Sequence, residues 1–306
     1  MPYKHLDKTA IPILEKNIQA KIKWVRKDHF VYHPKAIACL NKFNWIYEQT
    51  FFYDDTEDLI HDMESISLIG NTGLGKSSII NELRRTHSRQ HNPTYEKYPV
   101  AYCLLKDSIT GLKGLYTSLL SAYGHPLAKA EALKMSNIRI SELEDVFIHT
   151  LKETETKLFI IDEFQHTKGR NQRAILNMLK RTMLASQVPF IPVGMPETKS
   201  ILDMDMQLSN RCPVRPYSHL KFLKFKDDEY RSFLSGYEKF QPFPEPSDLS
   251  SKDFANMIFD KVQLPKPHLG ETNRRNMVIL IKTASVIALR NNHNRIEEED
   301  LKNAQL

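Results

Sequence analysis

Between residues 65 and 200, the chain alternates between two patterns of apolar positions. Short, nearly continuous apolar runs are typical of buried strands and are expected at 65–70, 99–105, 157–162 and 188–194. Apolar residues at helical spacing predict helices at 76–86, 111–123, 141–153 and 171–185. This alternation predicts an α/β fold, in which helices cover both faces of a parallel sheet.

The parts of the chain on either side of this region have helical periodicity instead. Residues 11–25 carry apolar residues at helical intervals, which predicts one helix with a single apolar stripe. A second helix should begin at Pro34, because proline suits the first turn of a helix. Helical periodicity returns from residue 252, after a proline-containing connection at 236–251. We therefore expect three segments: an N-terminal helical segment at 1–64, an α/β core at 65–220 and a small C-terminal helical domain at 221–306.

A glycine-rich loop follows the first expected strand of the core. The chain has only ten glycines, yet Gly70, Gly73 and Gly75 fall within six positions and precede Lys76 and Ser77. This spacing, between a strand and a helix, is that of a P-loop. Glycine lets the backbone approach a ligand closely, and the N–H groups at a helix N-terminus favour anions.

The P-loop motif predicts a role for each of its residues. The loop backbone would surround the phosphates of ATP, Lys76 would contact the β- and γ-phosphates, and the Ser77 hydroxyl would hold Mg²⁺. The nucleotide-binding residues expected from the motif are Gly70, Asn71, Thr72, Gly73, Leu74, Gly75, Lys76, Ser77 and Ser78.

An acidic pair follows the third expected strand. The apolar residues 158–161 are followed directly by Asp162 and Glu163. At a strand end beside a P-loop, Asp162 would bind the nucleotide's Mg²⁺ and Glu163 would polarise the attacking water. A solvated strand end is the alternative interpretation, but the P-loop earlier in the chain favours the catalytic one.

Phosphoryl transfer also needs positive charge near the γ-phosphate, which an arginine of a neighbouring subunit often supplies. Arg211 follows the strand that ends at Gly194 and is the first candidate, with Arg215 as the second. A salt bridge at a helix end is the alternative role for Arg211.

Composition limits the class of protein and of partner. The formal net charge of +6 suits a polyanionic partner, although a P-loop accounts for part of it. The cysteines Cys39, Cys103 and Cys212 form no Cys-x-x-Cys pair, which favours a reducing, cytoplasmic setting. The sequence shows neither a signal peptide nor an apolar stretch of about 18 residues, so we expect a soluble, intracellular protein without a membrane partner.

The order of these motifs resembles that of an AAA+ ATPase, and more narrowly that of the transposon target-selection ATPases of the TniB/TnsC family, relatives of MuB. "IIDEFQH" is similar to the family's Asp-Glu-x-x-His strand end, and "VPFIPVGMPET" to its Pro-x-x-x-Val-Gly-x-x-Glu stretch. "DMQLSNR", which ends at Arg211, resembles Asp-x-Gln-Leu-x-x-Arg, and "GETNRRNMVILIKTASVIAL" resembles the lid helix. The resemblance extends over almost the whole chain.

The resemblance implies an AAA+ P-loop core with a helical lid at 221–306, in which Arg275 would be the second sensor of the nucleotide. In one respect the chain departs from the pattern. The strand that ends at Gly194 lacks the Asn, Thr or Ser that many AAA+ proteins use as a first sensor. Glu197 or Thr198, just beyond it, could take that place, and slow turnover is expected.

The resemblance also implies a function and partners. Members of the family assemble with ATP into rings or helical filaments on double-stranded DNA. They link a TniQ-like target selector to the transposase, and hydrolysis disassembles the complex. We expect the same of this chain, as an ATPase stimulated by DNA or partners. Two alternatives stay open: a replication initiator or helicase loader of the same superfamily, and a nucleotide-binding scaffold that hydrolyses little ATP.

An assembly that surrounds DNA must direct basic side chains at the phosphates. Lys106 and Lys113 lie in the stretch that resembles the DNA-tracking loop of the relatives. Arg139, preceded by Lys134 and Ser136, is a further candidate. For each of these residues, the alternative is an ordinary solvated side chain.

The remaining candidates have less support. Lys168, Arg170 and Arg173 form a basic loop that could face DNA, the transposase or a neighbouring subunit. Tyr32 and His33 are candidate neighbours of the adenine base.

Overall fold

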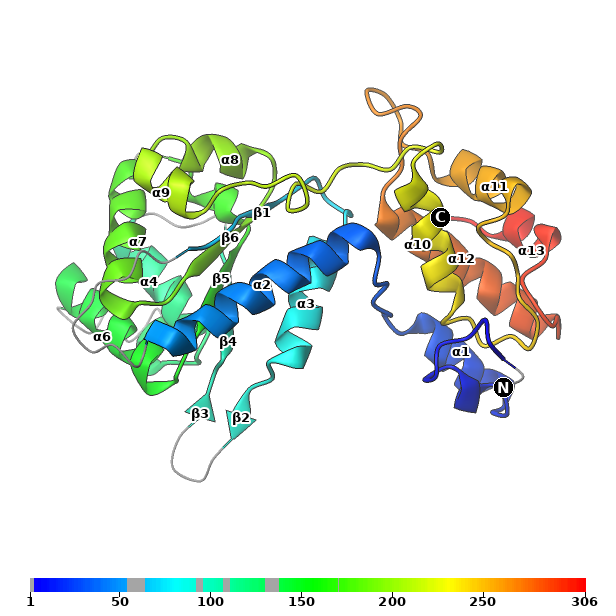
Figure 1. The fold of residues 1–306 in the computed structure, drawn as a ribbon, viewed down its shortest axis with the longest axis horizontal. Helices are drawn as coiled ribbons and strands as arrows, with labels where there is room; N and C mark the ends of the chain where they lie inside the picture. Colours follow the sequence, from blue (N-terminus) through cyan, green and yellow to red (C-terminus); the bar gives the residue numbers. More distant parts are fainter. Residues whose placement is uncertain (1–2, 54–63, 92–95, 107–110, 130–137, 170) are drawn as a thin grey trace. The chain divides into compact units, whose positions relative to one another are not determined.

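The computed structural model of the chain describes residues 3–53, 64–91, 96–106, 111–129, 138–169 and 171–306. The chain forms two compact units, each with a hydrophobic core of its own (Figure 1). The core unit comprises Ala38–Thr72 and Lys76–Leu220. The helical unit comprises Met1–Ile37, Gly73–Gly75 and Lys221–Leu306.

A four-stranded parallel sheet forms the centre of the core unit (Figure 1). Its strands are β1 (Leu68–Ile69), β4 (Val100–Leu104), β5 (Leu158–Asp162) and β6 (Phe190–Gly194). Their order is β1-β6-β5-β4, so β5 lies between β6 and β4. Strands β5 and β6 are buried along their whole length, as expected for a parallel sheet covered on both faces.

Residues 211–220 run beside β1 and take the place of a fifth strand. The backbone N–H groups of Ser65, Ser67 and Ile69, in β1 and just before it, donate to the carbonyls of Arg211, Pro213 and Ser218 at 3.0–3.1 Å. In return, the N–H of Leu220 donates to the carbonyl of Ile69 at 2.8 Å. The strand that leads into the glycine loop is therefore hydrogen-bonded on both sides.

Helices cover both faces of this sheet (Figure 1). On one face lies α3 (Lys76–Thr86), with α2 (Pro34–Tyr53) beside it, and on the other lie α4 (Leu112–Ser121), α6 (Ile140–Glu153) and α7 (Gln172–Ser186). The short helices α8 (Glu197–Leu202) and α9 (Met206–Arg211) follow β6. The strands β2 (Gln90–His91) and β3 (Glu96–Lys97) pair antiparallel between α3 and β4.

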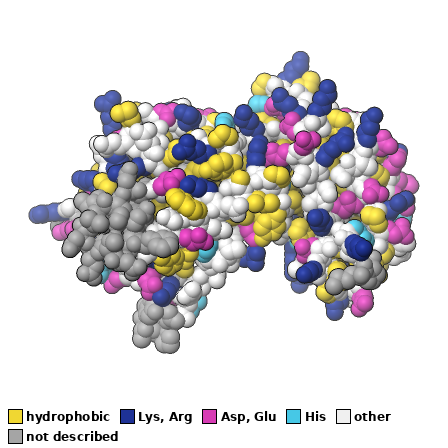
Figure 2. Space-filling model, in the orientation of Figure 1, with side chains coloured by type: hydrophobic (Ala, Val, Ile, Leu, Met, Phe, Trp, Pro, Cys, Tyr) yellow, Lys and Arg dark blue, Asp and Glu magenta, His cyan; other side chains and the backbone are white. Residues whose placement is uncertain are grey.

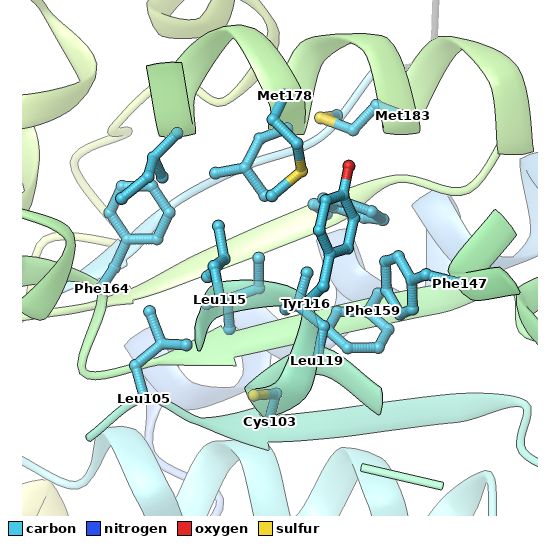
Figure 3. Close-up of a cluster of buried hydrophobic side chains, with 14 of the residues drawn as sticks. Cys103, Leu105, Leu115, Tyr116, Leu119, Phe147, Phe159, Phe164, Met178 and Met183 are labelled. Atoms are coloured by element: carbon cyan, nitrogen blue, oxygen red, sulfur yellow. The ribbon is translucent and has the colours of Figure 1, made fainter. Parts of the chain in front are cut away.

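The face under α4, α6 and α7 carries the hydrophobic core of this unit (Figure 3). Alternate strand residues point into it, among them Cys103 of β4 and Phe159 of β5, because side chains alternate between the faces of a sheet. Phe147 of α6 packs edge-on against Phe159, with ring centroids 5.3 Å apart. This packing fixes β5, and with it the acidic pair at its end.

The helical unit is built around one central helix, α12 (Arg274–Arg290). Around it pack α1 (Ile18–Arg26), α10 (Asp228–Glu238), α11 (Lys252–Val262) and α13 (Glu298–Asn303). Asn273 caps α12 by accepting a hydrogen bond of 2.8 Å from the N–H of Asn276. Among the described residues, no helix is long and apolar enough to span a bilayer.

The α/β fold and most of the expected elements are confirmed. Helix α3 spans the expected residues 76–86, and α2 begins at Pro34. Strands β4, β5 and β6 lie within their expected runs. The hairpin of β2 and β3 was not expected, since its strands are only two residues long and carry no apolar alternation.

The N-terminal part differs from the expectation. The single helix expected over 11–25 is wrong, because Ile11–Ile13 form a short 3-10 turn and α1 begins only at Ile18. The side chain of Asn17 accepts a hydrogen bond of 2.9 Å from the N–H of Ala20, and such a cap starts a new helix. By contacts, residues 1–37 group with the helical unit and residues from Ala38 with the core unit.

Candidate functional site

The glycine loop connects β1 to α3. Gly73 and Gly75 have φ angles of 79° and 91°, a left-handed backbone that favours glycine. Lys76 opens α3, and its side chain is nearly buried, at 8% exposed. Its Nζ donates to the carbonyls of Gly70 (2.5 Å) and Asn71 (3.1 Å). The ammonium group therefore lies against the loop backbone, while Ser77 and Ser78 are exposed in the first turn of α3.

Lys76 interacts electrostatically with the acidic pair after β5. Burial lowers the pKa of Lys76, and the negative charges of Asp162 and Glu163 oppose this shift. The two sequence motifs, separate along the chain, are thus brought into one cluster of charges by the parallel sheet. A buried cation beside two carboxylates at a strand end is the type of arrangement that functional sites use.

Asp162 is the more buried of the two carboxylates, at 4% exposed. Its Oδ1 accepts a hydrogen bond of 2.8 Å from the N–H of Glu163, and its Oδ2 accepts one of 2.9 Å from the hydroxyl of Tyr102. Burial raises the pKa of Asp162, and these two hydrogen bonds and the charge of Lys76 act in the opposite direction. The sequence gives no sign of Tyr102, because the contact forms only when β4 and β5 pair.

Glu163 is accessible and held in an uncommon backbone conformation. Its side chain is 39% exposed, and its φ and ψ of 56° and 41° are left-handed. Such a conformation is costly for a residue other than glycine and is found often at functional sites. The side chain of Gln165 donates a hydrogen bond to Oε2 of Glu163, and His166 Nε2 lies 3.8 Å from the same oxygen.

The two arginine candidates lie on the segment beside β1. Arg211 ends α9 and is half-buried. Asp205 caps this helix by accepting a hydrogen bond of 3.0 Å from the N–H of Leu208. Arg215 is exposed and lines a cavity of about 320 Å³ together with Lys199.

In the helical unit, the candidate Arg275 is exposed in the first turn of α12, whereas its neighbour Arg274 is only 4% exposed. Arg274 forms an ion pair with Oε1 of Glu229, and Lys35 Nζ lies 2.8 Å from Oε2 of the same carboxylate. Burial, together with the charges of Arg274 and Lys35, lowers the pKa of His33 to about 3, so this histidine is neutral beside Glu229. Sequence reasoning missed Arg274 and Glu229, because no local pattern marks them.

The candidates for DNA contact are exposed at one edge of the core unit. Lys106 follows the end of β4, and Lys113 lies in the first turn of α4. Arg139 directly precedes α6, which runs back toward the start of β5, and its N–H donates to the Glu142 carboxylate at 2.7 Å. By chain direction, all three lie on the side where the parallel strands end. The other residues considered for this role are Lys168 and Arg173, which are exposed, and Lys134, Ser136 and Arg170, which lie outside the described residues.

Charges of both signs lie on the described part of the face drawn in Figure 2. On the face drawn in Figure 2, Lys and Arg side chains are interspersed with Asp and Glu side chains.

The chain is similar to known proteins in both sequence and fold. A family model described as "TniB: Bacterial TniB protein" matches residues 21–221. No curated protein matches the chain. The fold is similar to that of the Aeropyrum pernix ORC1 protein, solved in complex with DNA, with 14% identity, a TM-score of 0.54, and coverage of 92% of this chain and 67% of that one. The ADP form of the Aeropyrum pernix ORC2 protein gives 14% identity, a TM-score of 0.58, and coverage of 92% and 70%. At these identities the similarities show the fold alone, and it is the fold expected from the sequence.

Proposed function

The chain belongs to the bacterial TniB family, and from this premise we propose that it is an ATP-dependent regulator of DNA transposition. In the ATP-bound state it assembles on double-stranded DNA as a ring or helical filament and links a TniQ-like target selector to the transposase. Hydrolysis then disassembles the complex. The observation that supports an ATP-driven switch best is the grouping of Lys76 with Asp162 and Glu163 in the core unit.

Each residue of this cluster has a separate role in ATP binding or hydrolysis. Lys76 Nζ exchanges the carbonyls of Gly70 and Asn71 for the β- and γ-phosphate oxygens. Carboxylate and hydroxyl oxygens are ligands that Mg²⁺ prefers, so Asp162 and Ser77 fit that ion, which neutralises phosphate charge when bound. Glu163, being accessible, orients the attacking water and draws on its proton.

Two arginines complete the proposal. Arg211, with Arg215 as the alternative, contributes positive charge to the γ-phosphate held by a neighbouring copy. Arg275, exposed at the start of α12, reports the nucleotide to the helical unit.

Lys106, Lys113 and Arg139 contact DNA phosphates, which gives binding that depends on salt and not on sequence.

Negative-stain microscopy with duplex DNA tests this proposal, with and without a non-hydrolysable ATP analogue. We expect rings or filaments on DNA only when the analogue is present, and none for Lys76→Ala. A wild-type protein that stays monomeric and off DNA in both samples would refute the proposal.

A substitution of the catalytic glutamate tests the role of hydrolysis. With ATP, Glu163→Gln should bind nucleotide but remain trapped in its DNA-bound assembly, whereas the wild type should disassemble. Glu153→Gln is the matched control, because Glu153 is exposed at the end of α6. A nucleotide-binding scaffold with little hydrolysis predicts instead that Glu163→Gln behaves as the wild type does.

The second candidate function is that of a replication initiator or helicase loader. Its support is the fold shared with the ORC1 protein of Aeropyrum pernix, whose structure contains DNA. Binding assays with a transposase and with a replicative helicase, each purified, distinguish the two functions. Nucleotide-dependent capture of the helicase alone would favour the initiator.

A further inference from the structure

The end of β6 lacks the polar side chain that would sense the nucleotide from this strand. β6 ends at Gly194, which has no side chain, and Met195 follows. Of the two substitutes considered from the sequence, Glu197 is exposed in α8, and Thr198 is wholly buried. A connection from this strand end to the catalytic centre therefore has to come from another group.

Gln165 makes that connection. It lies in the 3-10 turn Phe164–Thr167, directly after the acidic pair, and its side chain is half-buried. Its Oε1 accepts a hydrogen bond of 3.1 Å from the N–H of Met195, and its Nε2 donates to Oε2 of Glu163. One amide group thus spans from the end of β6 to the carboxylate after β5.

Gly194 makes room for this arrangement. A methyl group at Gly194 would collide with Oε1 of Gln165 and with Oγ1 of Thr198. The absence of a side chain at the strand end and the presence of the amide are therefore two parts of the same packing. The polar group expected on β6 has its counterpart on the turn after β5.

His166, the residue after Gln165, does not supply the same restraint on Glu163. His166 Nε2 is 3.8 Å from Oε2 of Glu163, which is beyond hydrogen-bond distance. The left-handed backbone of Glu163 needs surrounding contacts to persist, and the bond from Gln165 is one of them.

We propose that Gln165 is the positioning residue for Glu163, tying the catalytic carboxylate to the end of β6 in place of a first sensor on that strand. This inference rests on the proposed ATPase function and deepens it. The β6 end also touches the P-loop strand, since the N–H of Gly70 donates to the carbonyl of Gly194 at 3.0 Å. A shift of the glycine loop on nucleotide binding would therefore reach Glu163 through Gln165.

Two substitutions separate the two bonds of the amide. Gln165→Ala removes both of them. Gln165→Glu keeps an acceptor for the N–H of Met195 but replaces the donor to Glu163 with a second carboxylate. Gln263→Glu is the matched control, because Gln263 is exposed after α11, where its amide donates to the carbonyl of Asp260.

Two measurements are needed, and only one of them requires turnover. Hydrogen–deuterium exchange of the peptide containing Met195, in nucleotide-free protein, reports the bond to β6. Steady-state ATP hydrolysis reports kcat and KM. For Gln165→Ala, we expect faster exchange at Met195 and a kcat lower by roughly tenfold or more, the scale seen when a supporting residue is lost, with KM within about twofold. For Gln165→Glu, we expect wild-type exchange at Met195 and the same loss of kcat.

The outcomes are decisive in each case. Unchanged exchange at Met195 in Gln165→Ala would overturn the bond to β6, and an unchanged kcat in Gln165→Glu would overturn the positioning of Glu163. A rise in KM with constant kcat would also count against it, because it would place the residue in substrate binding. If the wild type itself hydrolyses no ATP under any condition, the proposed function fails, while the exchange result still tests the contact.

Discussion

The hydroxyl of Tyr102, on β4, donates a hydrogen bond of 2.9 Å to Oδ2 of Asp162, at the end of β5. The register of the strands explains the contact. Tyr102 is paired with Ile160, so Asp162 is its diagonal neighbour on the same face. The guanidinium of Arg84 lies over the Tyr102 ring, 4.9 Å from its centroid. Asp162 therefore has a polar partner of its own besides Lys76.

The buried charge of Asp162 should cost stability near neutral pH. We expect Asp162→Asn to stabilise the folded chain by about 1 kcal/mol, because a neutral amide costs less to bury than a carboxylate. The sign follows from burial, which raises the pKa of Asp162 above its ordinary value of 3.8. The folded state then favours the protonated carboxyl. This preference stabilises the folded state fully at pH values below the ordinary pKa, and the stabilisation is lost as pH rises through the higher pKa of the folded state.

The gain from Asp162→Asn should therefore be largest at neutral pH and shrink in acid. Thermal unfolding of the nucleotide-free protein across a pH series measures it, with Asp145→Asn, an exposed residue of α6, as the control. A gain of the same size at every pH would contradict this account.

The carboxylate of Glu229 should be important for the stability of the helical unit. It faces the buried Arg274, so Glu229→Gln should destabilise this unit by about 3 kcal/mol, the scale for breaking a buried ion pair. Lys35→Met should cost less than about 1 kcal/mol, since Lys35 is 33% exposed and the pair is screened by solvent.

Fluorescence of Trp24 can follow this unit alone. The chain has two tryptophans, and Trp45 is 42% exposed, so a Trp45→Phe background leaves Trp24 in α1 as the reporter. In this background, urea unfolding should give Glu229→Gln a clearly lower free energy of unfolding than Lys35→Met. Equal losses would show that Arg274 does not depend on this carboxylate.

Gly194→Ala should destabilise the core unit by roughly 1–3 kcal/mol, because the added methyl group overpacks the space held by Gln165 and Thr198. The double variant Gly194→Ala with Gln165→Ala should lose less than the sum of the single losses, since one colliding group is gone. A double-mutant cycle by chemical denaturation measures the difference, and strict additivity would argue against the predicted collision.

Mixing of two inactive variants should restore ATP hydrolysis if the arginine acts between copies. We expect Lys76→Ala to lose nucleotide binding but to keep Arg211, and Arg211→Ala to keep nucleotide binding but to lack the arginine. The mixture should regain part of the wild-type rate on DNA, and neither variant alone should exceed about a hundredth of it. Arg215→Ala serves as the comparison, and complementation by this variant in place of Arg211→Ala would reassign the role.

The sequence predicted those parts of the fold that depend on neighbouring residues. The helix from Lys76 to Thr86 could be bounded because the glycines before it and its apolar spacing are local signals. The acidic pair could be assigned to the end of β5 for the same reason, since four apolar residues precede it. Such signals lie within a window of a few residues.

The contacts that escaped prediction join residues distant in the chain or lack a chemical signature. Glu229 meets Lys35 across almost two hundred positions, and neither residue stands out from other exposed charges. Gln165 is close to Glu163 in sequence, but a single amide after an acidic pair has no distinctive pattern. Arg274 and Arg275 are adjacent, and only the packing of α12 decides which of them is buried.

The segment Arg211–Leu220 is joined by backbone hydrogen bonds to residues 65–69, which lead into the glycine loop. A displacement of this strand must therefore carry the segment with it or break backbone hydrogen bonds. The part of the chain proposed to hold a copy's own nucleotide is thus coupled by backbone hydrogen bonds to the part proposed to serve its neighbour's. In an assembly of many copies, such a linkage would pass the nucleotide state of one site to the next without any change in the helical unit.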